Sequence, residues 1–228
     1  MNKGIKVLIW IILDTMLFIV LLFSSLQVVV YNDAYFEWHY TQHDIVAITQ
    51  INLDNLMEVT DKMMEYLIDQ RETLDMTTLI NGQEEEVFGE REKAHMVDVK
   101  NLFLKGKQLR DISLVSLVLI LVYFSRTKKD MLIGWFNQLV RFFIVSFVLI
   151  GVFGGIIATD FNKYFTLFHE LFFTNDLWLL DPETDILINM VPEIFFFQTV
   201  MLIILLFVVS IVLVLGIARF MSKRLKRV

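Results

Sequence analysis

The sequence predicts a mainly α integral membrane protein in which four transmembrane helices carry a small extracytoplasmic α+β cap. Three observations predict this. The 228 residues are 56% hydrophobic and include 21 Phe, the charges lie in blocks between long apolar runs, and one long block is polar enough to fold in water. The absence of cysteine excludes a thiol nucleophile, a thiolate metal site and disulfides. Nothing in the sequence supports nucleic-acid binding.

Residues 1–30 form the cytoplasmic tail and the first span. The apolar run from Ile5 to Val30 is long enough to cross a bilayer at roughly 1.5 Å per residue. Lys3 and Lys6 stand at its start, as in a signal peptide, but its core is longer than a signal sequence needs and lacks a small-x-small cleavage site. We therefore expect a retained helix. Asp14 lies within it, and an acid at that depth is expected to face protein rather than lipid.

Residues 31–110 form the predicted extracytoplasmic cap, which holds 16 acidic and 8 basic residues. An amphipathic helix is predicted by apolar residues at helical spacing, namely Leu53, Leu56, Met57, Met63, Met64, Leu67 and Ile68. Asn81-Gly82 between two short strand candidates predicts a β-hairpin. Another helix is expected to begin near Gly89 and to continue past His95 toward Phe103.

The rest of the chain alternates apolar and polar blocks. We assign a second span at 111–125, a cytoplasmic loop with room for an interfacial helix at 126–141, a third span at 142–159, an extracytoplasmic aromatic and acidic segment at 160–192, a fourth span at 193–218, and a basic cytoplasmic tail at 219–228. Lys and Arg gather at both termini and in the 126–129 loop, whereas Lys163 is the single basic residue of the 160–192 segment. The positive-inside rule therefore places both termini in the cytoplasm.

All four histidines fall on the predicted outer side. His95 has Glu92 three residues before it and Asp98 three after, so on a helix either acid is able to orient the ring. The alternative is a solvated, charged helix face. His39 and Asp44 match the His-x4-Asp spacing of glycerolipid acyltransferases, but an acidic cap meets that spacing by chance, and we set it aside.

His169 lies among phenylalanines. At helical spacing Phe165, Phe168 and Phe172 share its face, which predicts a partly desolvated ring at the membrane boundary. The alternative is an interfacial aromatic belt, and that reading explains the phenylalanines better than the histidine. A histidine is an effective proton shuttle near neutral pH because its ordinary pKa is about 6.5.

The stretch from Trp178 to Asp185 has a local structural interpretation. Asp181 is expected to cap a helix whose first position is Pro182, and Asp185 to bond to nearby backbone or cap groups. Trp178 suits the membrane interface. The chain contains no Gly-x-Ser-x-Gly elbow, no phosphate-binding glycine loop and no His-Glu-x-x-His zinc helix.

Two segments together resemble the bacterial lipoprotein intramolecular transacylase family. They are the run from Arg91 through His95 to Lys100, and the run from Phe168-His169-Glu170-Leu171-Phe172-Phe173 through Trp178, Asp181-Pro182, Thr184-Asp185, Leu187-Ile188 and Pro192 to Phe195-Phe196. The resemblance extends to the order of one span, a long cap and three more spans. It implies a multi-pass bacterial cell-membrane enzyme whose catalytic residues correspond to His95 and His169.

The resemblance also implies a reaction and a substrate. The sn-2 acyl chain of a diacylated lipoprotein moves to the α-amine of its N-terminal cysteine and gives the lyso form. Within this reading we expect His95 as base and His169 as acid or oxyanion partner, although the reverse assignment stays open. We expect Phe165, Phe168, Phe172 and Trp178 to bind substrate, and Asp98, Asp181 and Asp185 to support the site.

No metal, cofactor or obligate protein partner is expected beyond the lipoprotein substrate and membrane lipid. The alternative function is a non-catalytic membrane sensor or assembly partner whose acidic cap binds a ligand. That alternative predicts that the two histidines lie far apart. The sequence gives little support for a transporter, because Asp14 is the only ionisable residue clearly inside a predicted span.

Overall fold

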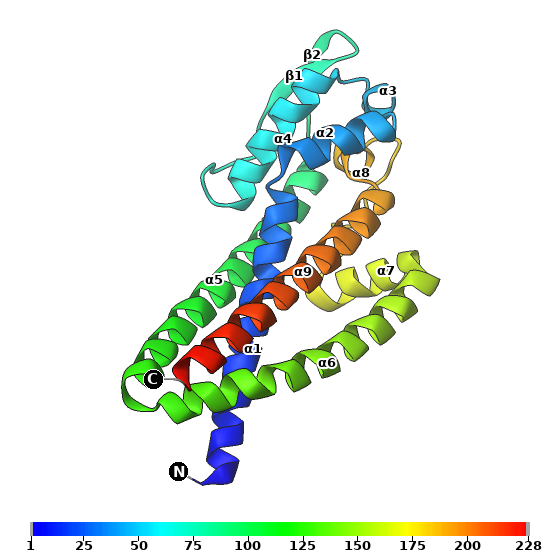
Figure 1. Cartoon of the computed structure of the whole chain (residues 1–228). Coiled ribbons are helices and arrows are strands. Elements are labelled where there is room, and N and C mark those ends of the chain that lie inside the picture. Colours follow the sequence, from blue (N-terminus) through cyan, green and yellow to red (C-terminus); the bar gives the residue numbers. More distant parts are fainter. Residues whose placement is uncertain (1, 227–228) are drawn as a thin grey trace. The chain divides into compact units, whose positions relative to one another are not determined.

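The computed structural model describes residues 2–226 and is mainly helical (Figure 1). Its elements are α1 Lys3–Val30, α2 Asp33–Gln42, α3 Ile45–Thr49, α4 Leu53–Leu67, β1 Thr77–Ile80, β2 Gln83–Glu86, α5 Glu90–Thr127, α6 Lys129–Thr159, α7 Phe161–Phe172, α8 Ile186–Met190 and α9 Glu193–Leu225. Within residues 2–226, four helices (α1, α5, α6 and α9) are long and apolar enough to cross a membrane. The predicted fold class is confirmed, and the side of the membrane on which the cap lies stays a prediction.

The chain divides into two compact units, and each is described by itself. The span unit comprises Met1–Gln27, Lys107–Asp160 and Leu202–Val228, whereas the histidine unit comprises Val28–Gly106 and Phe161–Met201. The histidine unit takes its name from the four histidines of the chain, all of which it contains. Every catalytic, substrate-binding or supporting residue expected from the sequence therefore belongs to one unit.

Large apolar side chains from α1, α5, α6 and α9 form the core of the span unit. The members of this core that are at most 1% exposed are Leu13, Leu139, Phe143, Phe207 and Ile211. Their burial removes apolar surface from solvent and joins helices that are distant in the sequence.

Asp14 connects α1 to α6 inside this core. Its side chain is fully buried, and it accepts a 2.7 Å hydrogen bond from Trp135 Nε1 and a second hydrogen bond from Gln138 Nε2. The prediction that this acid faces protein is confirmed. Because a buried carboxylate is costly without partners, these two donors make its position in the span tolerable.

Two of the spanning helices are longer than the sequence predicts. Helix α5 holds 38 residues and is roughly 57 Å long, against a hydrocarbon core of about 30 Å. The helix expected near Gly89 and the second span at 111–125 are therefore one helix. Likewise, α6 joins residues 129–141 to the third span without a break, whereas Arg126 and Thr127 end α5. The two prolines of the chain, Pro182 and Pro192, lie outside both helices, so nothing interrupts either one.

In the histidine unit, α4 buries part of the apolar face that the sequence predicts. Of the predicted residues, Leu56, Met63 and Leu67 are at most 5% exposed, and so is Val59, which the prediction did not include. The other four predicted residues are partly buried. Asn52 caps the start of the helix, since its Oδ1 accepts the N–H of Asn55 at 2.9 Å. The predicted amphipathic helix is confirmed.

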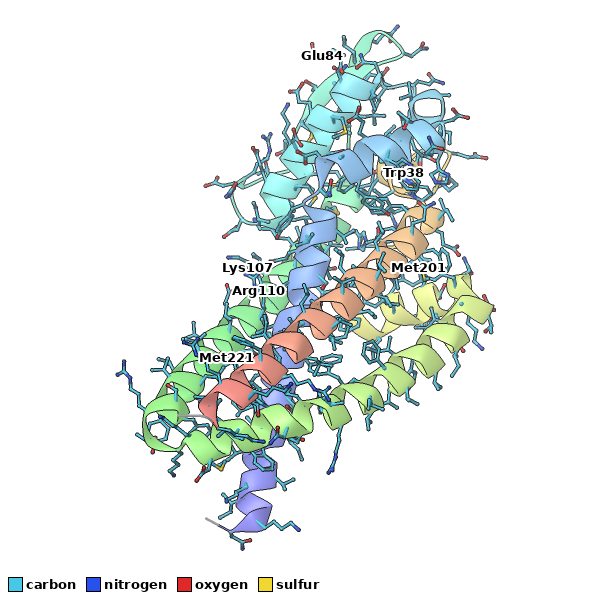
Figure 2. All side chains as sticks on the ribbon, viewed as in Figure 1. Trp38, Glu84, Lys107, Arg110, Met201 and Met221 are labelled. Atoms are coloured by element: carbon cyan, nitrogen blue, oxygen red, sulfur yellow. The ribbon has the colours of Figure 1, made fainter. Side chains whose placement is uncertain are left out.

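The predicted hairpin is confirmed as well. Strands β1 and β2 pair antiparallel, with Ile80 opposite Gln83, and Asn81 and Gly82 form the turn. Both turn residues have positive φ (51° and 80°), the requirement of a two-residue turn that matches strand twist. Figure 2 labels Glu84 on β2, whose side chains are all exposed.

Candidate active site

The first turn of α5 is organised by Glu92, whose side chain is 1% exposed. Its Oε2 accepts the N–H of Gly89 at 2.6 Å, and its Oε1 accepts the N–H of Leu187 at 2.6 Å. The first bond caps α5, and the second ties that helix to the start of α8. The interpretation of Glu92 as an acid that orients His95 is therefore wrong, because both of its oxygens bind backbone.

His95 lies in the second turn of α5 and is 7% exposed. Its ring packs edge-on against Phe173, with ring centroids 5.3 Å apart. Its Nδ1 is buried and has no hydrogen-bond partner among residues 2–226. A buried polar atom without a partner is costly, and a catalytic role is one of the reasons why proteins retain such an atom. His39 shares this feature, so the position of His95 beside His169 is what makes it a candidate catalytic residue.

His169 lies on α7, is 8% exposed, and has one nitrogen fixed by the backbone. Its Nδ1 lies 2.7 Å from the carbonyl oxygen of Phe165. A carbonyl oxygen only accepts, so Nδ1 carries the proton, and the lone pair of the neutral ring is on Nε2. Burial lowers the pKa of His169 below its ordinary value, and the bond to Phe165 partly offsets this effect. The neutral ring therefore dominates at neutral pH.

Aromatic rings surround the His169 imidazole. Trp178 stacks on it at a centroid distance of 4.9 Å, and the ring of Phe165 meets it edge-on at 4.4 Å. Phe168 lies edge-on at 5.5 Å. These rings exclude water from one side of the imidazole, which is the cause of its lowered pKa.

The two histidines lie together in the histidine unit. Their ring centroids are 6.1 Å apart, and the rings are tilted by 38°. At this separation both imidazoles are able to contact one reacting group placed between them. A protonated ring also disfavours protonation of the other, so the pair holds at most one proton near neutral pH.

Phe173 belongs to this cluster, although the sequence predicts a role only for its neighbour Phe172. Phe173 is 7% exposed, and its ring lies 5.6 Å from His169 as well as 5.3 Å from His95. Phe172, the predicted substrate-binding residue, is half exposed, and its ring centroid lies 4.8 Å from that of Phe168. The spacing of four residues from His169 to Phe173 was the signal that would have found it.

Polar contacts tie the segment after α7 to α5. Arg91 donates from Nε to the carbonyl oxygen of Leu179 at 3.1 Å and from a terminal nitrogen to the carbonyl oxygen of Asp176. The indole nitrogen of Trp178 donates to the carbonyl oxygen of Asn175 at 3.1 Å. These bonds fix the Trp178 ring that covers His169. No local sequence signal marks Arg91 for this role, because its partners lie more than eighty residues away.

Asp98 contributes to the same tie. Its Oδ2 accepts from the Asn175 side-chain amide at 2.8 Å. Asp98 therefore helps to position the segment that carries Trp178, and its expected support of His95 stays a prediction. Burial and the nearby His169 lower the pKa of His95 to about 4, and the charge of Asp98 partly offsets this. No hydrogen bond joins the Asp98 and His95 side chains in the described residues.

The side chains of Asp181 and Asp185 accept hydrogen bonds from backbone N–H groups of residues 181–185, and neither side chain bonds to a histidine. Asp185 Oδ2 accepts the N–H of Asp181 at 2.7 Å, and Asp181 Oδ1 accepts the N–H of Glu183 at 2.9 Å. The prediction that Asp181 caps a helix starting at Pro182 is wrong. The Asp181 carbonyl closes one turn with the Asp185 N–H at 2.8 Å, and α8 begins only after Asp185.

A second histidine pair joins α2 to α9. The Gln198 amide lies between the rings, with its Oε1 3.4 Å from His39 Nδ1 and its Nε2 donating to His43 Nε2 at 3.0 Å. His39 is fully buried, its Nε2 has no partner among residues 2–226, and burial lowers its pKa to about 4. The buried ring is thus neutral and serves packing against Phe195, whose ring lies 5.0 Å away.

Residues 2–226 contain no cluster of three or more His, Asp or Glu side chains placed to hold a metal ion. The chemistry that the arrangement supports is proton transfer by two imidazoles beside aromatic surfaces. A neutral imidazole with one nitrogen fixed is suited to take a proton at the other nitrogen.

Comparisons with known proteins agree with this architecture. The sequence model of the family described as lipoprotein intramolecular transacylase Lit matches residues 11–196. Among solved structures, the chain is similar to the membrane integral lipoprotein intramolecular transacylase Lit from Bacillus cereus, with a TM-score of 0.79 and 24% identity over 100% of both chains.

Two variants of the Bacillus cereus protein are also similar. A variant with one histidine replaced by alanine gives a TM-score of 0.77 and 23% identity over 99% of this chain and 97% of that one. A variant with a histidine replaced by arginine gives a TM-score of 0.77 and 25% identity over 98% and 94%. No curated protein sequence matches the chain.

Proposed function

Because the chain belongs to the lipoprotein intramolecular transacylase Lit family, we propose that it moves the sn-2 acyl chain of a diacylated lipoprotein to the α-amine of that lipoprotein's N-terminal cysteine. The product is the lyso form, with one acyl chain on nitrogen and one on the glyceryl group. The enzyme class rests on the family, and the histidine pair with ring centroids 6.1 Å apart carries the proposed mechanism.

The reaction requires no enzyme nucleophile. The substrate amine attacks the ester carbonyl through an eight-membered ring, so that the new C–N bond forms as the acyl C–O bond breaks. The chain has no cysteine, in keeping with a direct transfer. One proton must leave the amine and one must reach the glyceryl oxygen, and the two histidines are suited to these two transfers.

We assign the base role to His169, the reverse of the expectation from sequence. The Phe165 carbonyl holds the proton on Nδ1, leaves Nε2 free to accept the amine proton, and stabilises the imidazolium that forms. His95 then stabilises the oxyanion through a ring N–H, and the His169 imidazolium returns its proton to the departing glyceryl oxygen, so that the protons balance. This assignment uses the single observation that distinguishes the two rings, the fixed tautomer of His169.

The substrate-binding roles follow from exposure. Phe168 and Phe172 are half exposed, and we assign them to contact with the acyl chains. Trp178 and Phe165 contact the His169 ring and hold its orientation. Orientation of reacting groups supplies several kcal/mol of the barrier reduction in intramolecular reactions.

A binding-only role is disfavoured by the same geometry. The sensor alternative predicts that His95 and His169 lie far apart, whereas they are neighbours.

We further propose that the histidine unit is extracytoplasmic and that both termini are cytoplasmic. The positive-inside rule supports this orientation. Because the chain has no cysteine, one introduced cysteine reports its own location. Glu84→Cys on the exposed hairpin should react with a membrane-impermeant maleimide in intact cells, whereas Lys128→Cys should react only after lysis.

The decisive experiment gives purified enzyme a diacylated lipopeptide with a free amine. We expect the amine to become blocked at unchanged intact mass, and tandem mass spectrometry should place the acyl chain on nitrogen. His95→Ala and His169→Ala should abolish the change, whereas His43→Ala, from the other pair, should retain it. Full turnover by both of the first two variants would overturn the mechanism.

A further inference from the structure

The span unit contains a cavity of about 410 Å³ that the proposed transacylation does not use. Two helices line it. Residues from α6 are Phe136, Asn137, Val140 and Arg141, and residues from α9 and the position after it are Arg219, Ser222, Lys223 and Lys226. Met221, labelled in Figure 2, marks the last turns of α9 that form one side.

The two sides of the cavity are held together by a defined contact. Ser222 Oγ donates to Asn137 Oδ1 at 3.1 Å, and the Ser222 residue is 4% exposed. On α9, Arg219, Ser222 and Lys223 lie three and four residues apart and therefore share one face. On α6, Asn137 and Arg141 do the same, so the helices present a polar floor flanked by cations.

The charge around this cavity is entirely positive. Arg141, Arg219, Lys223 and Lys226 line it, and no carboxylate does. Among residues 2–226 no ion pair involves any of these four side chains. Four unneutralised cations around one hollow repel one another, and an anion between them removes that repulsion.

Two simpler explanations account for only part of this arrangement. The positive-inside rule and the negative end of the α9 dipole both favour cations near the C-terminus. Arg141 lies in the interior of α6, where no helix end favours it. Neither explanation accounts for the hollow between the helices or for its Asn137–Ser222 floor.

We propose that this cavity binds a phosphate-bearing anion, held by Arg141 and Arg219 with Lys223 and Lys226 beside them. Guanidinium groups bind phosphate oxygens through two parallel hydrogen bonds, and Asn137 retains amide donors for a third contact. Basic pockets between membrane helices on the cytoplasmic side bind anionic lipid headgroups. The apolar Phe136 and Val140 in the lining suit the glycerol and upper acyl region of such a lipid.

The test measures lipid binding by the full-length protein in detergent. Native mass spectrometry gives the Kd for phosphatidylglycerol and, as a neutral reference, for phosphatidylcholine. The double variant Arg141→Gln with Arg219→Gln should weaken phosphatidylglycerol binding roughly thirtyfold. The double variant Lys128→Gln with Lys129→Gln removes the same charge from exposed positions outside the cavity and should weaken it less than about threefold.

A second arm distinguishes the source of the phosphate group. Inorganic phosphate is titrated against the lipid complex at constant ionic strength. Failure of millimolar phosphate to displace the lipid from the unsubstituted protein supports a headgroup as the ligand, whereas complete displacement supports free phosphate. Equal losses in both double variants, or no loss in either, would overturn the site.

The milder variant Lys223→Gln keeps the test decisive if the arginine variant is poorly folded. It should weaken phosphatidylglycerol binding roughly fivefold with an unchanged thermal midpoint in the absence of lipid. Unchanged binding in a well-folded Lys223→Gln protein would also count against the proposal. None of these readouts depends on transacylase activity, so the lipid site and the catalytic proposal fail separately.

Discussion

His169 Nδ1 donates its proton to the carbonyl oxygen of Phe165, one helical turn earlier, at an N···O distance of 2.7 Å. This bond lies within α7 and needs no second element to form. It selects the tautomer whose Nε2 is basic, and it remains favourable when that nitrogen takes a proton. The backbone of α7 therefore performs the orienting task that a carboxylate performs in many catalytic sites.

The pH dependence of turnover should reflect this base. Burial lowers the pKa of His169 below its ordinary value near 6.5, so the neutral, active ring persists as the pH falls below that value. The substrate α-ammonium, whose ordinary pKa is about 8, gives kcat/KM one acid limb of its own, and we expect protonation of His169 to add a second, steeper decline below pH 6.5. The profile from pH 4.5 to 8 with a diacylated lipopeptide checks this, and a profile that does not steepen below pH 6.5 would contradict the assignment.

Glu92→Gln should lower both stability and activity. The carboxylate accepts two backbone N–H groups, whereas the amide has one oxygen and would direct an NH2 group at the other donor. The loss should cost about 1–3 kcal/mol. Thermal unfolding and turnover are the measurements. Glu90→Gln is the matched control, since Glu90 lies in the same turn with a 95% exposed side chain. Equal effects of both variants would argue against a role of Glu92 in joining α5 to α8.

The role of Asp98 is decided by two substitutions. If Asp98 positions the segment through its bond to Asn175, then Asp98→Asn keeps an acceptor oxygen and should retain most of the turnover. Asp98→Ala removes that oxygen and should reduce kcat several-fold, because the Trp178 segment loosens. A large loss in Asp98→Asn, with an altered pH profile, would instead indicate that its charge acts on His95.

Stability should fall in acid because of His39. Its folded-state pKa is about 4, whereas the unfolded chain binds the proton near 6.5, so protons favour the unfolded state between these values. The expected loss from pH 6.5 to pH 4 is at most roughly 3 kcal/mol. Tm measured across that range in detergent should drop less steeply for His39→Gln than for the unsubstituted protein. Parallel curves would show that His39 does not contribute.

Local patterns in the sequence predicted the local structure well. The Asn81-Gly82 pair requires positive φ at both positions, and the apolar spacing in residues 53–68 fits one helix face; both features are set by neighbours in the chain. The charged and aromatic residues near them in sequence made His95 and His169 candidates, whereas the resemblance to the transacylase family implied their catalytic role.

Local sequence patterns do not predict contacts between distant segments. Glu92 bonds to Leu187 across 95 positions, and Arg91 bonds to Leu179 across 88. A pattern three or four residues long carries no information about such partners, so Glu92 was paired with the nearest histidine instead. The turn at Asp181 was misjudged for a related reason, since a cap residue followed by proline marks the start of a helix but not its length.

The contact between α1 and α6 yields the last prediction. A Cβ built on Gly134 would lie 2.4 Å from Cζ2 of Trp10, and the indole is fixed because its Nε1 donates to the Met131 carbonyl oxygen at 3.1 Å. Gly134→Ala should therefore destabilise the span unit by about 1–3 kcal/mol, despite the better helix propensity of alanine.

Gly151→Ala is the matched control for this substitution, because a Cβ at Gly151 meets nothing within 4 Å and its helix is the same. It should leave Tm unchanged or raise it. Adding Trp10→Phe to Gly134→Ala removes the ring atoms that clash, so the double variant should recover part of the loss. Equal Tm values for the two alanine variants would show that α1 gives way at Trp10 and that the close approach does not hold the helices in place.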